Sequence, residues 1–480
     1  MNHKQSMLAA MQYAKNLGAD FADMRLKDIR MENLKVEDGE VQTASTERSQ
    51  GYGIRVYVNG AMGFVASNDL EKINETVQAA YNLAQASLTL LAEKAVLDQK
   101  PPVTDAHYAT PMVTDPFTVP LSDKLVLMME CDKNMRAQGA SKTSVAFNFR
   151  KDDVWFADTD GSFILQNFCQ GDIALGVFAI SDADAQRRTY NSVLRAGYEA
   201  VLELNLPQKA ALIGREAVEL LNAPECPSGE FDVILMPRQM FLQIHESVGH
   251  PTELDRVLGS EAAFAGRSFV EPANLNEKHL QYGSEHVTIV ADATCPRGLG
   301  TFAYDDEGVP AQNVTLIDKG KFVAFQTSRD NAPKVGLNSS GAGLSDGWKN
   351  LPIVRMTNIN LLPGQFTLNE LVSGIEYGFL FDQNKSWSID DLRVNFQFAC
   401  EIAHEIKDGK LTGRVFKNPI YSGKTAEFWG SCDGTANADH WELIGTPNCG
   451  KGQPMQVMRV SHGSAPTRFR KVKVGVSDVK

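Results

Sequence analysis

Helical periodicity is found in four stretches of the first half of the chain. Apolar residues recur at intervals of three and four within 1–26, 69–96, 121–137 and 207–222, so each stretch predicts an amphipathic helix. Prolines crowd the segment around 100–120, which indicates an irregular connection before the third helix. Polar residues interrupt the first stretch at helical spacing, which favours a helix over a signal peptide.

Strand pairs are indicated where apolar runs flank a two-residue turn. Asp-Gly at 38–39, Asn-Gly at 59–60 and Asp-Gly at 160–161 readily take the positive φ angles of tight turns, so each predicts an antiparallel hairpin. Further on, the apolar run 231–236 is typical of a buried strand, and 394–406 alternates apolar with mostly polar residues. The second half is therefore expected to be rich in β-structure.

A domain boundary is predicted near Pro224, where the fourth helix ends and a small loop leads into the buried strand. Pro237 follows that strand and is a good first residue for another helix. We therefore expect an α+β protein with an N-terminal α+β domain, 1–224, that contains antiparallel hairpins. A β-rich C-terminal domain, 225–480, would follow and carry the chemistry.

Composition narrows the classes of function. The 480 residues can bury a large core, and 47 Lys and Arg against 59 Asp and Glu leave a net charge of −12. Such a surface repels phosphate backbones, which argues against general nucleic-acid binding. No stretch approaches the roughly 18 apolar residues of a membrane span. The seven cysteines are scattered without a CxxC pair, which favours a reducing compartment, so we expect a cytoplasmic protein.

The candidate chemistry lies in the HExxxH segment that begins at His245. It is one residue longer than the HExxH of zinc peptidases, in which two histidines on one helical face bind zinc and the Glu is the general base. Five residues of ideal α-helix turn about 140°, so His245 and His250 could face one metal only if the helix distorts. Gly249 and Pro251 favour a π-bulge or a loosened turn that corrects this angle. A helix end with two partly exposed histidines is the simpler alternative.

A catalytic zinc needs a third protein ligand and keeps one position open. Glu253 and Asp255 follow the motif directly, and the remaining histidines and cysteines are distant candidates. Cys449 lies in a loop of small residues, where the nearby Lys451 would favour its thiolate. A buried, inert thiol is the commoner state of a lone cysteine, so the residues alone leave the third ligand open.

Several motifs together resemble the TldD/PmbA family of metallopeptidases, in the family's order and over nearly the whole chain. They are HESVGHPTELD from His245, a Ser/Gly/Arg stretch at 260–267, YDDEGVP from Tyr304, RMTN from Arg355, LPG from Leu362 and CGK from Cys449. The resemblance implies that His245, His250 and Cys449 bind Zn²⁺ and that Glu246 is catalytic. Since all four are present, the chain is similar to the active TldD type and not to its paralogue TldE/PmbA, which has lost the motif.

The resemblance also implies an activity and partners. We expect a zinc-dependent peptidase that cleaves short peptides and unstructured protein segments, with Glu246 as general base on zinc-bound water. The family's dimers enclose an inner cavity that admits extended peptide. A homodimer, or a heterodimer with a TldE/PmbA-like paralogue, is therefore expected, without nucleic-acid or membrane partners.

Two other functions stay open. A cysteine hydrolase would use Cys449 with His440 or His462, but it leaves the HExxxH segment without a role. A noncatalytic binding partner, like the family's paralogue, is the second alternative. The intact His245, Glu246 and His250 argue against it.

Other polar residues have simpler interpretations. His404 and Glu405 resemble half a zinc motif, but they lie on the alternating segment and are expected to face the core. The acidic run 305–307 would bind a cation or substrate amines, or form a solvated loop. Cys432 and His440 flank a Gly/Asp/Asn loop that would line a cleft only if the fold brings it there.

Overall fold

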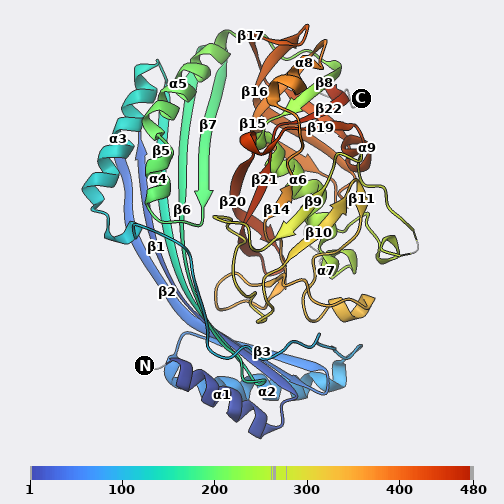
Figure 1. Cartoon of the computed structure of the whole chain (residues 1–480). Helices are drawn as coiled ribbons and strands as arrows, with labels where there is room; N and C mark the ends of the chain where they lie inside the picture. The colour runs from blue at the N-terminus through green and yellow to red at the C-terminus, as the bar shows by residue number, and fades with distance from the viewer. Residues whose placement is uncertain (1–2, 261, 263–265, 277, 476–480) are drawn as a thin grey trace.

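The computed structural model describes residues 3–260, 262, 266–276 and 278–475 (Figure 1). Two sheet-based parts follow each other along the chain, and their mainly antiparallel sheets with packed helices confirm the α+β class. Part of the predicted 260–267 motif lies outside the described residues.

The N-terminal part is built on a long, curved sheet of seven strands. They are β1 (Phe21–Glu37), β2 (Glu40–Val58), β3 (Ala61–Ser67), β4 (Ala106–Ala109), β5 (Lys142–Asp158), β6 (Phe163–Ile180) and β7 (Ala185–Leu194). The order is β3-β2-β1-β5-β6-β4, and β7 also pairs with β6. The three predicted hairpins are confirmed as β1–β2, β2–β3 and β5–β6. Asp38 and Gly39 take φ values of 48° and 84°, as a tight hairpin turn requires.

Helices cover this sheet on its outer side and at its lower end in Figure 1. They are α1 (His3–Leu17), α2 (Ile73–Ser87), α3 (Leu121–Ala137), α4 (Glu199–Glu203) and α5 (Leu206–Asn222). The prediction of a helix over 69–96 was too long, because its last part leaves the helix after Ser87 and a 3-10 turn. The amides of Ala95 and Asp98 instead donate to the carbonyls of Gly60 and Arg329.

The C-terminal part contains a second seven-stranded sheet that closes on itself, since β15 pairs with both β8 and β16. Its strands are β8 (Gly229–Leu235), β15 (Tyr377–Ile389), β16 (Asn395–Lys407), β17 (Lys410–Lys417), β18 (Ile420–Lys424), β19 (Cys432–Thr435) and β22 (Thr467–Val474). The strands predicted at 231–236 and 394–406 are confirmed as β8 and β16. The assignment of 1–224 and 225–480 as separate domains stays a prediction.

Smaller elements surround this closed sheet. The strands are β9 (Ile289–Asp292), β10 (Asn313–Asp318), β11 (Lys321–Phe322), β12 (Gly343–Leu344), β13 (Ile353–Val354), β14 (Ile359–Leu361), β20 (Glu442–Lys451) and β21 (Gln456–Ser464). The helices are α6 (Pro237–Ile244), α7 (Leu254–Val257), α8 (Leu368–Ser373) and α9 (Thr425–Gly430). Helix α6 belongs to the main C-terminal core together with aromatic residues of β15 and β16. The HExxxH segment that follows α6 is therefore held in a packed interior.

The acidic segment 305–307 joins the two parts and is not the solvated loop that we considered. Asp306 pairs with Lys27 at 2.9 Å, and Glu307 pairs with Arg55 at 2.8 Å. Both cations come from the N-terminal sheet, so this segment buries its charges at the contact between the parts instead of exposing them.

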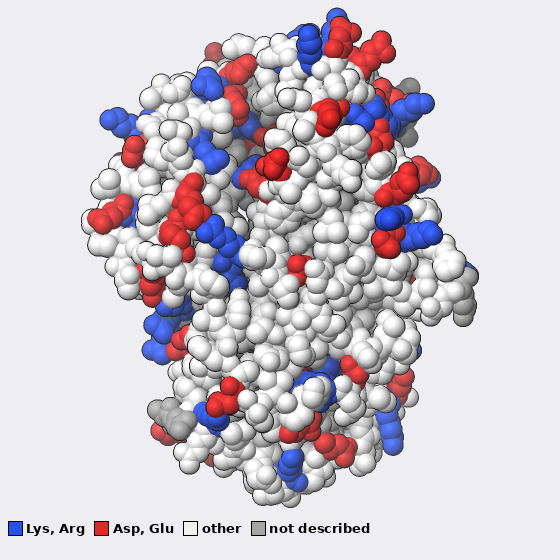
Figure 2. Space-filling view, in the orientation of Figure 1, with Lys and Arg blue, Asp and Glu red and all other residues white. Residues whose placement is uncertain are grey.

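The surface carries charges of both signs. In Figure 2, acidic and basic side chains are interspersed over the visible face, which has no broad basic area. Within the described ranges, none of the helices has the length and apolar character needed to cross a bilayer.

Candidate metal centre

The helix that carries the HExxxH segment changes its winding at the motif. α6 is α-helical to Ile244, residues His245–Gly249 form a π-turn, and His250–Thr252 form a 3-10 turn. The amide of His250 donates to the carbonyl of His245, which confirms the predicted π-bulge. The extra residue in this turn absorbs the 140° mismatch of an ideal helix. Both imidazole rings consequently lie on one side of the helix.

Gly249 permits this turn to pack against the neighbouring strand segment. A Cβ atom at this position would lie 2.3 Å from the sulfur of Met356. Met356 is fully buried, so its side chain would have to shift within a packed interior to relieve this clash. The RMTN motif therefore contributes the residue against which the π-turn closes.

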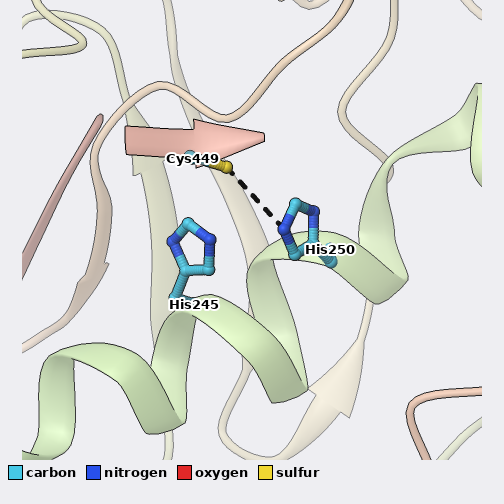
Figure 3. Close-up of side chains that lie close together, drawn as sticks. All are labelled: His245, His250 and Cys449. Carbon is cyan, nitrogen blue, oxygen red and sulfur yellow. Dashed lines mark hydrogen bonds between the residues drawn. The ribbon is translucent and has the colours of Figure 1, made fainter. Parts of the chain in front are cut away.

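Cys449 joins the two histidines from a distant part of the chain (Figure 3). Its sulfur lies 3.7 Å from Nε2 of His250, and the donor atoms of His245, His250 and Cys449 all lie within 4.8 Å of one another. Cys449 is on β20, just after a break in register with β21. Arg355 donates to the Cys449 carbonyl at 2.5 Å and so fixes the strand that presents the thiol.

The three donors have the composition of a zinc site, and one of their separations matches its geometry. For Zn–S of about 2.3 Å and Zn–N of about 2.05 Å, two ligands of one tetrahedral ion lie about 3.6 Å apart. The observed separation between the Cys449 sulfur and His250 is 3.7 Å. Two imidazoles and one thiolate also form a donor set that zinc prefers, and the residues therefore fit this metal.

The electrostatics of the cluster favour a thiolate. Burial alone would raise the pKa of the Cys449 thiol, but His245, Arg355 and His250 together lower it well below its usual value. Burial likewise opposes the charged form of His245, yet Cys449 raises the pKa of this imidazole. The metal-free pair is therefore a thiolate and an imidazolium. Lys451, which we expected to favour the thiolate, instead donates to Asp255 at 2.7 Å.

A second histidine sets the tautomer of His245. Nδ1 of His245 lies 2.7 Å from Nε2 of His462, and Nδ1 of His462 lies 3.3 Å from the carbonyl of Ile359. Because the carbonyl can only accept, His462 donates to it and accepts from His245 at its other nitrogen. Burial lowers the pKa of His462 well below its usual value, so it stays neutral. His245 therefore directs Nε2 toward the other two donors.

Glu253 plays the same part for His250. Its Oε2 accepts from Nδ1 of His250 at 2.8 Å and lies 3.3 Å from Nζ of Lys451 and 3.4 Å from Nε of Arg256. Neither Glu253 nor Asp255, the two local candidates for the third ligand, belongs to the donor cluster. Metal-bound histidines usually donate their second nitrogen to a carboxylate, and the position three residues after His250 was a usable signal for this contact.

Glu246 lies beside the cluster and is contacted through both carboxylate oxygens. Nε1 of Trp387 donates to Oε1 at 2.9 Å, and Arg393 donates to Oε2. Burial would raise the pKa of Glu246, but His245, His250 and Arg393 lower it, so the group is ionised. Sequence reasoning missed Trp387 and Arg393, which lie more than 140 positions away and form no local motif.

The cluster opens into a cavity of about 530 Å³ between the two parts of the chain. Its walls include Arg187 and Asn191 from β7, residues 383–385 from β15, and residues 445–450 from β20. Residues from three strands thus line the cavity.

The other candidates lie elsewhere. Cys432 is packed in the C-terminal core, and Glu405 is buried on β16, where it accepts from Thr412 at 2.9 Å. Neither residue lines the cavity of the cluster, and neither do His404 and His440. We therefore assign these four residues no role in the metal centre.

Comparison with protein families identifies the chain's class. A helix that presents two histidines to a distant cysteine has the donor set of a metalloenzyme site. A family model described as the PmbA/TldA metallopeptidase C-terminal domain matches residues 228–476, and one described as domain 1 of these metallopeptidases matches 22–84. The first match spans more than half of the chain, and the chain belongs to the PmbA/TldD family of metallopeptidases. The resemblance inferred from the motifs is confirmed.

Relatives of similar length carry metalloprotease names. A metalloprotease of Methanocaldococcus jannaschii is 29% identical over 411 residues, which cover 84% of this chain and 87% of the relative. One of Methanothermobacter thermautotrophicus is 28% identical over 95% of both chains. A zinc metalloprotease TldD homolog of Saccharolobus solfataricus is 24% identical over 98% of this chain and 99% of its own.

Solved structures share the fold. A proposed modulator of a DNA gyrase from Thermotoga maritima has a TM-score of 0.79 at 16% identity, and covers 98% of this chain and 100% of its own. TldE from Thermococcus kodakarensis has a TM-score of 0.75 at 16% identity with the same coverage. At this identity the likeness concerns the fold alone.

Proposed function

We propose that the protein is a zinc-dependent peptidase in which His245, His250 and Cys449 hold Zn²⁺ and Glu246 is the general base. The observation that carries the proposal is the convergence of three metal donors and one ionised glutamate on a single cavity. His462 and Glu253 would keep the two imidazoles in the ligating tautomer.

In the proposed hydrolysis, Glu246 transfers the proton and Trp387 positions Glu246. When bound, zinc acts as a Lewis acid toward water and the peptide carbonyl. Glu246 accepts a proton from the attacking water and passes it to the amine as the C–N bond breaks. Trp387, which donates to one carboxylate oxygen, holds the glutamate in place for both transfers.

Replacing Glu246 by glutamine tests this assignment. The amide preserves the shape of the side chain but cannot accept the proton, and it leaves the three metal donors intact. We expect full zinc content with turnover lower by about 10² or more. Glu427→Gln, at an exposed position on α9, is the matched control and should behave as wild type. Retained peptide cleavage by the Glu246 variant would remove it as the general base.

Peptides and unstructured protein segments are the proposed substrates. Residues of β15 and β20 line the cavity, and strand edges bind extended peptide through main-chain hydrogen bonds, whatever its side chains. A folded domain has no free backbone to offer. One flexible sequence should therefore be cleaved when free and resist cleavage when fused within a stable domain, and equal cleavage of both forms would refute this substrate class.

We further propose that the chain acts in the cytoplasm as a homodimer, or as a heterodimer with a TldE/PmbA-like paralogue, without nucleic-acid or membrane partners. The family resemblance suggests this assembly, and a TldE chain is among the structures that share the fold. Mass measured in solution, alone and with the paralogue, distinguishes the two forms. A fully active monomer would refute the dimer.

A cysteine hydrolase is the second candidate, because the Cys449 thiolate and the His245 imidazolium form an activated pair. The geometry fits it less well, since His462 contacts His245 instead of Cys449, and His440 does not line the cavity. It also leaves Glu246 without a role. Inhibition by chelators, with indifference of the zinc-loaded protein to thiol alkylation, would exclude it.

A further inference from the structure

A basic side chain faces Glu246 from the turn between β15 and β16. Arg393 donates through Nη1 to Oε2 of Glu246, while Trp387, from the end of β15, donates to Oε1. The Arg393 side chain is only 8% exposed, and it lines the same cavity as the three metal donors. The guanidinium therefore borders the cavity into which the three metal donors open.

The backbone holds Arg393 in an uncommon conformation. Its φ of 65° lies in the left-handed region, which residues other than glycine seldom adopt. Its amide donates to the carbonyl of Asp390 at 2.9 Å, and its own carbonyl accepts from the hydroxyl of Thr425 at 2.6 Å. Strained conformations persist where the surrounding structure enforces them, and they are concentrated at functional sites. The turn thus presents this guanidinium in a fixed direction.

Hydrolysis changes which anion the guanidinium faces. Glu246 takes a proton from water and becomes neutral, the water oxygen bonds to the carbonyl carbon, and the π-electron pair of the carbonyl moves onto its oxygen. The negative charge therefore passes from Glu246 to the substrate oxyanion without changing in total. A cation that contacts the oxyanion more closely than it contacts Glu246 in the bound complex stabilises the tetrahedral species more than the bound substrate, which is the condition for catalysis.

We propose that Arg393 is a catalytic residue that pairs with the oxyanion of the tetrahedral intermediate, and that Trp387 is a positioning residue for Glu246. This inference rests on the proposed peptidase function. Arginine suits the role because its planar fork can contact two oxygens at once, whereas lysine offers a single point charge.

The experiment compares zinc-loaded wild type, Arg393→Ala, Arg393→Lys and Arg414→Ala. Arg414 is an exposed arginine on β17, and its variant is the matched control. A flexible peptide gives kcat and KM. A phosphinic peptide, whose anionic tetrahedral group imitates the intermediate, gives a Kd by titration calorimetry. Zinc content and the thermal midpoint are recorded for every variant.

We expect Arg393→Ala to lower kcat by about 10²–10³ with KM changed by less than about threefold. The Kd of the phosphinic peptide should rise by about the factor by which kcat/KM falls, because both report binding of the tetrahedral form. The kcat of Arg393→Lys should lie between those of wild type and Arg393→Ala. If the alanine variant fails to fold, the lysine variant still tests the inference, because it keeps a buried positive charge beside Glu246. Arg414→Ala should match wild type.

Two results would overturn the inference. An unchanged kcat in Arg393→Lys and Arg393→Ala would remove Arg393 from the reaction. A lower kcat with an unchanged Kd for the phosphinic peptide would show that Arg393 acts only by placing Glu246. A zinc-loaded wild type that neither cleaves peptide nor binds the phosphinic peptide would instead refute the peptidase proposal, and this inference with it.

Discussion

His462 is buried and does not line the cavity of the donor cluster, yet its removal should weaken metal binding. Its Nε2 accepts the proton that His245 carries on Nδ1, at 2.7 Å, and this contact leaves Nε2 of His245 free for a ligand bond. In His462→Phe a ring of similar size keeps the packing but accepts no hydrogen bond. The metal-free His245 imidazolium can then turn its ring, and zinc binding at Nε2 must return the Nδ1–H toward an apolar neighbour.

The magnitude follows from that one orphaned donor. A buried polar group without a partner costs about 1–3 kcal/mol. Each 1.4 kcal/mol corresponds to about a factor of ten in affinity, so zinc binding should weaken about 5- to 150-fold. His462→Gln offers both an acceptor for His245 and a donor for the carbonyl of Ile359, and should recover part of this loss.

Competition with a chromophoric chelator measures the zinc affinity of wild type and both variants at one pH. The thermal midpoint of each metal-free form shows whether the fold is retained. A Kd for His462→Phe within about twofold of wild type, in a folded chain, would refute the claim that His462 sets the tautomer. An equal loss in His462→Gln and His462→Phe would attribute the effect to packing.

Three further outcomes test the site. Cys449→Ala should lose most of its zinc by elemental analysis, whereas Cys432→Ala, which removes a thiol from the core, should keep it; equal zinc in the two would exclude Cys449 as a ligand. Because the pKa of His245 is raised and that of Cys449 is lowered, the metal-free pair holds a proton on His245 that zinc displaces. Affinity should therefore rise with pH until the pH passes the raised pKa of His245, and calorimetry in buffers of different ionisation enthalpy should detect about one proton released; no release would contradict the ion pair. Gly249→Ala places a methyl group 2.3 Å from the Met356 sulfur and should destabilise the metal-free fold by about 1–3 kcal/mol in urea unfolding, with partial recovery when Met356→Ala is added.

The sequence by itself determined the features that depend on near neighbours. Asp-Gly and Asn-Gly turns, the amphipathic helix that ends at Asn222 and the π-turn at Gly249 all follow from conformational preferences within a few residues. The helix over 69–96 was predicted too long for the complementary reason. The end of this segment makes backbone hydrogen bonds with distant parts of the chain. The periodicity of nearby residues cannot predict such partners.

The family's motifs also placed His245, Glu246, His250 and Cys449 on one site before any geometry was available. Residue types alone had left the proposed third ligand open, since Cys449 is 199 positions from His250 and stands in no metal-binding repeat.

Only the tertiary structure decided what surrounds these residues. Trp387 and Arg393 reach Glu246 because β15 pairs with β16, with a register shift between Asn384 and Ser386. His462 reaches His245 because β21 lies beside the motif helix. Glu253 was visible in the sequence, but its contact with Lys451 required β20 to pack against the same turn. Such contacts depend on strand register and on the packing of the whole core. No short segment contains that information, because the partners are distant in the chain and adjacent only after folding.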